Sequence, residues 1–190
     1  MVEIFRGVAA STAERRAPRP GDDIVADGRV VVMDRAFTVG RPPEDVWPWL
    51  LQLGKARAGW YLPRAVERFL PAGRRALRHT DARWLEVKAG DVVPDYGGKH
   101  ATFTVAAITA PASLVYWSQR GQTAFTWSIT LQPVAGGSGS RVFLRLRMAP
   151  VRHRLLARTA GEFFDALTIA GMAAGLRERL AGRGTGRRAN

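Results

Sequence analysis

The sequence of 190 residues has no cysteine, few lysines and no long uninterrupted hydrophobic run. Without cysteine, disulfide bonds, thiolate metal sites and a cysteine nucleophile are excluded. The most apolar later stretch, residues 163–176, includes Asp165 and is shorter than the roughly 20 apolar residues that cross a bilayer. Near the start, Glu3 and Arg6 interrupt the region where a secretory signal needs apolar residues. We therefore expect a cytoplasmic protein without a transmembrane segment.

Acidic residues are also scarce, and none lies between Asp95 and Glu162. The chain carries 29 Lys and Arg against 16 Asp and Glu, a formal net charge of +13, and only three of the basic residues are lysines. A surface of this kind attracts nucleic acid, anionic lipid or acidic ligands. No nucleic-acid-binding motif accompanies the charge, and no surface that interleaves aromatic with basic residues is evident. We therefore expect no specific nucleic-acid partner, and a basic binder of nucleic acid or anionic membrane is the third of three functional hypotheses.

Composition and the positions of proline and glycine divide the chain into three parts. The hydrophobic fraction of 46% indicates a globular chain rather than a disordered one. Residues 1–28 are polar and contain Pro18, Pro20 and Gly21, which predicts a flexible lead-in. Residues 29–181 are expected to form one domain, and residues 182–190, rich in glycine and arginine, a disordered basic tail.

The domain is expected to begin with a strand and two short helices. Residues 30–39 are apolar and β-branched, as in a strand. Residues 40–45 (GRPPED) place proline and two acids where a helix begins. An interior Pro48 breaks a backbone hydrogen bond, so this helix is expected to be short or kinked. A second helix is predicted over residues 62–70, with Pro71 and Gly73 after its end.

The pattern of residues 101–148 predicts an antiparallel meander. Strands are expected at residues 101–109 and 114–119. Phe125, Trp127, Ile129 and Leu131 alternate with polar residues, and a GGSGS turn leads to a similar alternation over residues 142–148. One face is thus apolar and the other polar or cationic. On the cationic face, Arg141, Arg145 and Arg147 are expected to form a solvated stripe.

The last element is predicted to be a long helix over residues 153–180. Phe163, Leu167, Ala170 and Ala174 recur at helical spacing and indicate its apolar face. The middle of this helix is unusually small, which permits close backbone approach or leaves room for a ligand. Its small residues are Ala170, Gly171, Ala173, Ala174 and Gly175. Asp165 falls off the predicted apolar face and is expected to be solvated.

The order of elements and three segments resemble the START-like superfamily, also called SRPBCC or helix-grip. These segments are FTVGRPPEDVWPWLLQLG (37–54), LEVKAGDVVPDY (85–96) and the hairpin over residues 125–148, which are similar to bacterial polyketide cyclase/dehydrase-like members. The resemblance covers about residues 29–180. It implies an α+β fold in which a curved antiparallel sheet wraps around the long C-terminal helix. It also implies a cavity that commonly holds a lipid, sterol, hormone or polyketide, and no shared catalytic residues.

We therefore expect a binding protein for a small hydrophobic or amphipathic molecule, held between sheet and helix. The aromatic sheet face and the small-residue helix both favour this hypothesis over a solid core. The residues expected to line the cavity are Trp60, Tyr96, His100, Phe103, Tyr116, Phe125, Trp127, Leu144, Phe164 and Leu167.

The alternative is an enzyme of polyketide cyclase or hydratase type that uses polar groups at the cavity mouth. Residues 91–100 (DVVPDYGGKH) place Asp95, Tyr96, Lys99 and His100 close together, which could serve proton transfer. A polar loop before a strand explains the same residues and is the preferred interpretation. The three histidines lack metal-ligand spacing, so neither a metal nor another cofactor is expected.

Overall fold

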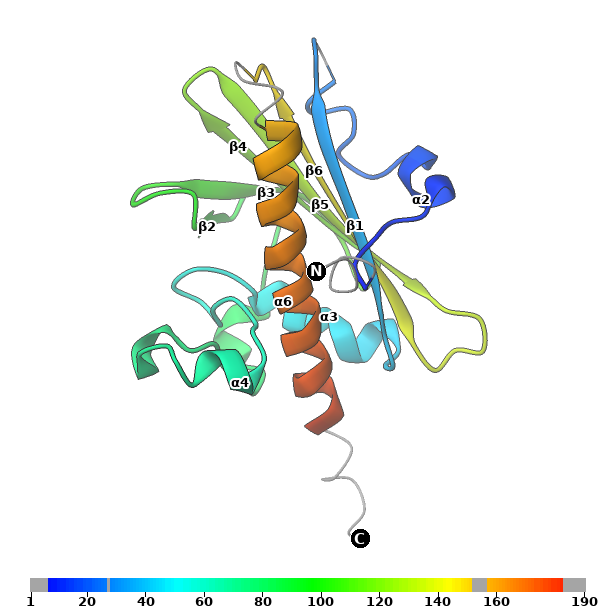
Figure 1. Ribbon diagram of the computed structural model, residues 1–190, viewed down its shortest axis with the longest axis vertical. Helices are drawn as coiled ribbons and strands as arrows, with labels where there is room; N and C mark the ends of the chain where they lie inside the picture. The colour runs from blue at the N-terminus through cyan, green and yellow to red at the C-terminus, as the bar shows by residue number, and fades with distance from the viewer. Residues whose placement is uncertain (1–6, 27, 152–156, 183–190) are drawn as a thin grey trace, which may run out of the picture.

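A six-stranded antiparallel sheet curves around one long helix, α6, in the computed structural model (Figure 1), which describes residues 7–26, 28–151 and 157–182. The strand order is β1-β6-β5-β4-β3-β2. The strands are β1 (Val31–Val39), β2 (Val92–Pro94), β3 (Thr102–Thr109), β4 (Ser113–Arg120), β5 (Thr123–Pro133) and β6 (Ser140–Ala149). The helices are α2 (Thr12–Arg16), α3 (Pro43–Gln52), α4 (Arg64–Glu67), η1 (Ala72–Arg74), η2 (Ala82–Trp84), η3 (Ala157–Gly161) and α6 (Glu162–Ala181).

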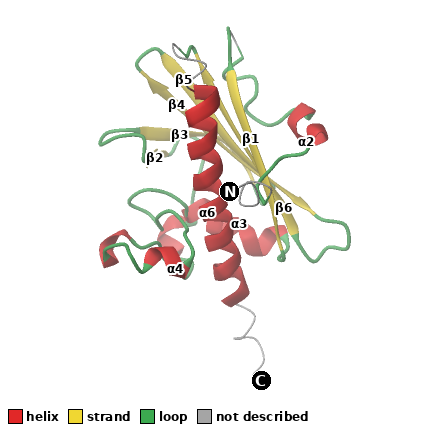
Figure 2. Ribbon diagram, in the orientation of Figure 1, coloured by secondary structure: helices red, strands yellow, loops and turns green. Residues whose placement is uncertain are grey.

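The predicted α+β helix-grip fold is confirmed. Figure 2 shows α6 lying across the concave face of the sheet, with α3 and α4 near its C-terminal half. The predicted hairpin at the glycine-rich turn joins β5 to β6, and β6 also pairs with β1, so that Met33 lies opposite Leu146. Alternation places Trp127, Ile129 and Leu144 on the side that faces α6.

The two short helices follow β1 as predicted, but they differ from the predictions in detail. Helix α3 continues through Pro48 without a break. The backbone bond that Pro48 cannot make would run to Glu44, which lies in the exposed first turn where water can replace it. The helix predicted over residues 62–70 is a single turn, Arg64–Glu67, followed by turns and the 3-10 helix η1.

The apolar face predicted for the last helix is wrong. Phe163 and Leu167 are 45% and 47% exposed. The side chains that α6 buries are instead Ala166, Ile169, Met172, Ala173, Leu176, Arg179 and Leu180. Two apolar stripes overlap along this helix, and spacing alone cannot say which one meets the sheet. The structure describes a π-helical turn, η3 (Ala157–Gly161), that leads into α6; residues 153–156 of the prediction lie outside the described residues.

The small residues of α6 permit a close approach, but to a loop rather than to the sheet. A Cβ atom added at Gly175 would lie 2.6 Å from the backbone N and C of Leu62, and one at Gly171 would lie 2.8 Å from Leu62 Cδ2. One turn further on, the buried Arg179 guanidinium donates to the carbonyl oxygens of Leu62 and Leu77 and to the carboxylate of Glu67. Backbone contact and a buried ion pair therefore fasten the loop to the helix.

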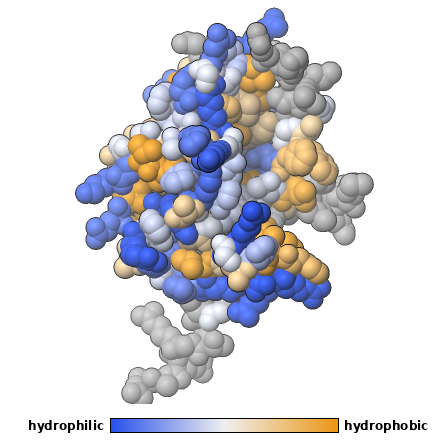
Figure 3. All heavy atoms as spheres, turned by 90° about the vertical axis from the view of Figure 1, so that its left-hand side faces the viewer, coloured by the Kyte–Doolittle hydropathy of each residue, from blue (hydrophilic) through white to orange (hydrophobic). Residues whose placement is uncertain are grey.

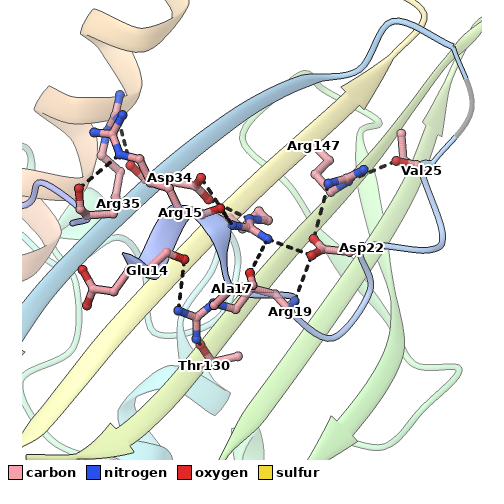
Figure 4. A network of polar contacts seen from close by, with 12 residues as sticks. Glu14, Arg15, Ala17, Arg19, Asp22, Val25, Asp34, Arg35, Thr130 and Arg147 are labelled. Atoms are coloured by element: carbon pink, nitrogen blue, oxygen red, sulfur yellow. Dashed lines mark hydrogen bonds and ion pairs between the residues drawn. The ribbon is translucent and has the colours of Figure 1, made fainter. Parts of the chain in front are cut away.

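The N-terminal segment lies on the convex face of the sheet, which corrects the expectation of a flexible lead-in for residues 7–26. Arg145 is buried there, and its guanidinium donates to Asp34 Oδ1 and Asp22 Oδ2, both at 2.7 Å. It also donates to the carbonyl oxygens of Arg15 and Ala17. Figure 4 shows these carboxylates and carbonyl groups converging from the segment and from β1.

The cationic stripe predicted on that face is therefore not solvated as a whole. Arg145 is covered, Arg147 donates to the Val25 carbonyl oxygen, and Arg141 pairs with Glu14. Arg19 from the N-terminal segment stacks over Phe143 at 3.8 Å from the ring centroid. A sequence pattern shows that these arginines share a face but not that a distant segment supplies their partners.

The approach of α6 to Leu62 predicts different effects for two glycines of one helix. Gly175→Ala should destabilise the protein by about 1–3 kcal/mol, because the new Cβ meets backbone that cannot rotate away. Both substitutions increase helix propensity by up to about 1 kcal/mol. In Gly171→Ala, however, the new Cβ meets only the flexible end of the Leu62 side chain. Urea unfolding should therefore rank the variants Gly171→Ala above Gly175→Ala. Equal stabilities would contradict a backbone contact at Gly175.

Candidate ligand pocket

An open pocket of about 300 Å³ lies between the N-terminal half of α6 and the concave face of the sheet. Residues from seven parts of the chain line it: Trp60, Asp95, Gly97, Phe103, Arg120, Phe125, Trp127, Leu146, Phe164, Asp165, Thr168 and Ile169. Strand alternation explains why β3 to β6 contribute several of these side chains on the same face. The walls are mainly aromatic and the charged groups are few, as in sites that bind small molecules.

The inner end of the pocket is closed by stacked aromatic rings. Trp127 stacks on Tyr116 at 5.7 Å between ring centroids and on Trp60 at 6.1 Å. Trp60 comes from the loop after α3, where Gly54 and Gly59 bond to each other through their backbones. Its Nε1 donates to the Thr168 carbonyl oxygen of α6 at 3.3 Å. Trp60 thus joins the loop, the sheet and the helix at one point of the pocket wall.

One side of the pocket holds an arginine with its carboxylate. Arg120, at the end of β4, forms an ion pair with Asp95. Its guanidinium lies 5.1 Å from the Phe103 ring centroid and 4.7 Å from that of Phe125. The aromatic faces and Asp95 stabilise this cation in a partly buried position. Arg120 can donate hydrogen bonds to a carbonyl or anionic group of a ligand.

The other side holds Asp165, which corrects the expectation that this residue is solvated. It lies one turn before Ile169 on the inward face of α6, and its Oδ2 is 2.9 Å from Arg35 Nε. Arg35 points inward from β1 and also donates to the carbonyl oxygens of Asp34 and Glu162. Burial raises the pKa of Asp165 to about 6, although the guanidinium of Arg35 opposes the shift.

The structure brings together half of the predicted ligand-binding residues. Trp60, Phe103, Phe125, Trp127 and Phe164 line the pocket. Whether they contact a ligand stays a prediction.

The other predicted residues lie around the pocket or away from it. Tyr116 belongs to the aromatic stack at the inner end of the pocket, and Tyr96 packs edge-on against Trp60 at 6.2 Å between ring centroids. Leu144 is buried in the core, Leu167 points away from the sheet, and His100 is exposed outside the pocket. His100 lies in the turn before β3, which begins only at Thr102. Because His100 is not part of the strand, the sheet does not hold its side chain on the inner face.

Sequence reasoning missed two of the three charged groups of the pocket, Arg120 and Asp165. Arg120 shares the parity of Tyr116 on β4, so alternation could have placed it on the inner face. Asp165 is four residues before Ile169, but this signal helps only once the inward face of α6 is known. Asp95 was expected in a polar segment, and the structure places it at the pocket edge.

In residues 7–26, 28–151 and 157–182, no three Asp, Glu, His or Cys side chains gather as a metal would require. None of the helices described there has the length and apolarity to cross a bilayer.

Comparisons with solved structures find proteins of similar fold. CalU16 from Micromonospora echinospora is 13% identical, with 84% of this chain and 88% of that chain covered and a TM-score of 0.47. A protein from Rhodobacter sphaeroides is 16% identical, with coverages of 81% and 99% and a TM-score of 0.48. DynU16, from the dynemicin biosynthetic locus, is 12% identical, with coverages of 79% and 47% and a TM-score of 0.46. These are similarities of fold. No protein-family model and no curated protein matches the sequence.

The raised pKa of Asp165 predicts how stability changes with pH. The folded protein holds a proton on Asp165 up to about pH 6, whereas the unfolded chain releases it near the ordinary value of 3.8. The free energy of unfolding should therefore fall by about 1–3 kcal/mol as pH rises from about 4 to above 6. In Asp165→Asn this fall should be absent. Urea unfolding at about pH 4 and at a pH above 6 measures the difference in both proteins.

Two other acids serve as references for this measurement. Glu14, whose pKa Arg141 lowers to about 2, contributes in the opposite sense and at lower pH. The exposed Glu86 provides a matched control, since Glu86→Gln should leave the fall intact. The same fall in Asp165→Asn as in the unmodified protein would contradict the assignment.

Proposed function

We propose that the protein binds a small amphipathic molecule with a compact apolar ring system in the pocket between sheet and α6. The observation that carries this proposal is an unfilled space of about 300 Å³ with aromatic walls and two charged pairs at its sides. A solid core would have filled this space with side chains. Of the ligands that the resemblance suggests, a polyketide-like or other ring compound suits this volume better than a long acyl chain.

The chemistry of the walls limits the ligand further. The rings of Trp127, Phe125 and Phe164 offer apolar area to a flat molecule. Arg120 can donate to a carbonyl, carboxylate or phenolate group, and Asp165 can accept from a hydroxyl or amine group. A ligand with polar groups at its edges and an apolar face would satisfy both sides of the pocket. The cytoplasmic location expected from the sequence stays a prediction.

Filling the pocket should prevent binding. Thr168→Trp places an indole in the space, whereas Leu167→Trp places the same group one residue away and outside the lining. With 1-anilinonaphthalene-8-sulfonate as a fluorescent probe, Thr168→Trp should weaken binding by about tenfold or more, and Leu167→Trp should leave it unchanged. Equal binding by both variants would contradict binding in this pocket.

The natural ligand can be sought by native mass spectrometry of the protein purified from its own host. A bound molecule that is present in the unmodified protein and in Leu167→Trp, but not in Thr168→Trp, would support the proposal. Its structure would also distinguish a ring compound from a lipid. Retention of the same molecule by Thr168→Trp would place it elsewhere.

A second candidate function is proton-transfer catalysis on the bound molecule, as in a cyclase or hydratase. The observation that favours it is Asp165, a carboxyl group in the pocket wall with a pKa near 6 that can give or take a proton close to neutral pH. If the protein is such an enzyme, Asp165→Asn should still bind the co-purifying molecule but stop its conversion, which mass spectrometry of the released compounds would detect. Conversion at an unchanged rate would exclude Asp165 as the acid or base.

A further inference from the structure

A single surface around α4 combines exposed apolar side chains with arginines. Phe69 is 76% exposed and Val66 is 45% exposed. Arg64, Arg68, Arg74 and Arg75 are exposed around them. We call these six residues the arginine–phenylalanine patch. Phe69 is the most exposed large apolar side chain in the described part of the chain, and the Arg68 guanidinium lies against its ring.

The patch carries positive charge that nothing nearby neutralises. None of its four arginines forms an ion pair in the part of the chain that the structure describes. The two neighbouring carboxylates are already engaged, since Glu67 pairs with Arg78 and Arg179, and Glu178 pairs with Arg78. The patch is therefore complementary to a surface of negative charge.

The patch is held in place rather than loosely attached. Glu67, at the end of α4, is buried and receives 2.6 Å hydrogen bonds from both Arg78 and Arg179. Arg75 Nε donates to the Leu70 carbonyl oxygen at 3.0 Å, which closes the turn after α4. The Arg68 guanidinium lies 4.6 Å from the Phe69 ring centroid. The Phe69 ring and the Arg68 guanidinium are therefore held together on the exposed side of α4.

Figure 3 turns this side of the molecule toward the viewer, and its lower part shows hydrophobic atoms set among hydrophilic ones. We propose that the arginine–phenylalanine patch docks on an anionic lipid surface, where arginines meet the headgroups and Phe69 inserts among them. Arginine and lysine near such a surface are each attracted to it, and an aromatic ring suits the interfacial zone. A lipid surface accepts a projecting side chain without a preformed groove, whereas base recognition or a protein partner needs a more extended contact. The inference does not depend on the ligand pocket.

The test is co-sedimentation of the full chain with vesicles. Vesicles of phosphatidylcholine mixed with phosphatidylglycerol should bind the protein, vesicles of phosphatidylcholine alone should not, and binding should weaken as salt rises. Phe69→Ser should weaken binding to the anionic vesicles by about tenfold, since the ring that inserts among the headgroups is lost. The double variant Arg68→Gln/Arg74→Gln should weaken it by a similar factor and reduce its dependence on salt.

Matched controls separate the patch from the overall charge of the protein. Arg29→Gln/Lys88→Gln removes the same charge at exposed positions elsewhere, and Val92→Ser removes an apolar side chain that is 62% exposed on β2. Both should bind vesicles as the unmodified protein does, and thermal unfolding should confirm that all four variants fold.

Four results would overturn the proposal. One is a failure to bind anionic vesicles at all, and another is an equal loss of binding in the patch variants and the controls. Binding to vesicles of phosphatidylcholine alone that is as strong as to the anionic ones would remove the role of charge. Tighter binding to polyglutamate or duplex DNA, equally reduced in Phe69→Ser, would assign the patch to a different partner.

Discussion

The contact of α6 with Leu62 is the constraint on which the functional features of this structure depend. Gly175 lets the helix backbone touch the loop backbone, and the buried Arg179 then bonds to carbonyl groups of that loop and to Glu67. The loop so fastened carries Trp60 into the pocket wall on one side and presents Phe69 to the surface on the other. One close approach between helix and loop therefore positions both the pocket and the patch.

The pocket exists because the helix and the sheet separate beyond this contact. Toward the C-terminal half of α6, Met172 and Leu176 are fully buried against the sheet. Toward its N-terminal half, Asp165 occupies the inward position instead, and a carboxylate needs a cation and some water rather than a packed core. Arg35 supplies the cation from β1, while Arg120 and Asp95 form the pair on the opposite side. Charge at both sides and rings between them give the space its amphipathic character.

Several of the arginines behind the large positive charge join distant segments of the fold. Arg145 joins the N-terminal segment to the sheet, Arg179 joins the loop to α6, and Arg35 joins β1 to α6. Each arginine is partnered by carboxylates or carbonyl groups that lie more than a hundred residues away in the sequence. Arginine suits this task because its planar guanidinium can satisfy several acceptors at once. The arginines around Phe69 stand apart, since they have no such carboxylate partner within the described residues.

Local pattern by itself determined five of the six strands, the glycine-rich hairpin and the aromatic inner face, because alternation in a strand assigns every side chain to one of two faces. It also indicated most of the aromatic pocket residues, including Phe125 and Trp127. It missed β2, which lies in the segment interpreted as a polar loop. It could not choose the buried stripe of α6, since a helix can turn any of several faces inward and only the sheet decides among them. Nor could it bring Arg15 and Asp22 to Arg145, or Arg35 to Asp165. Those contacts join segments distant in sequence, and burial of charge is favourable only where the partners meet, so tertiary structure alone decided them.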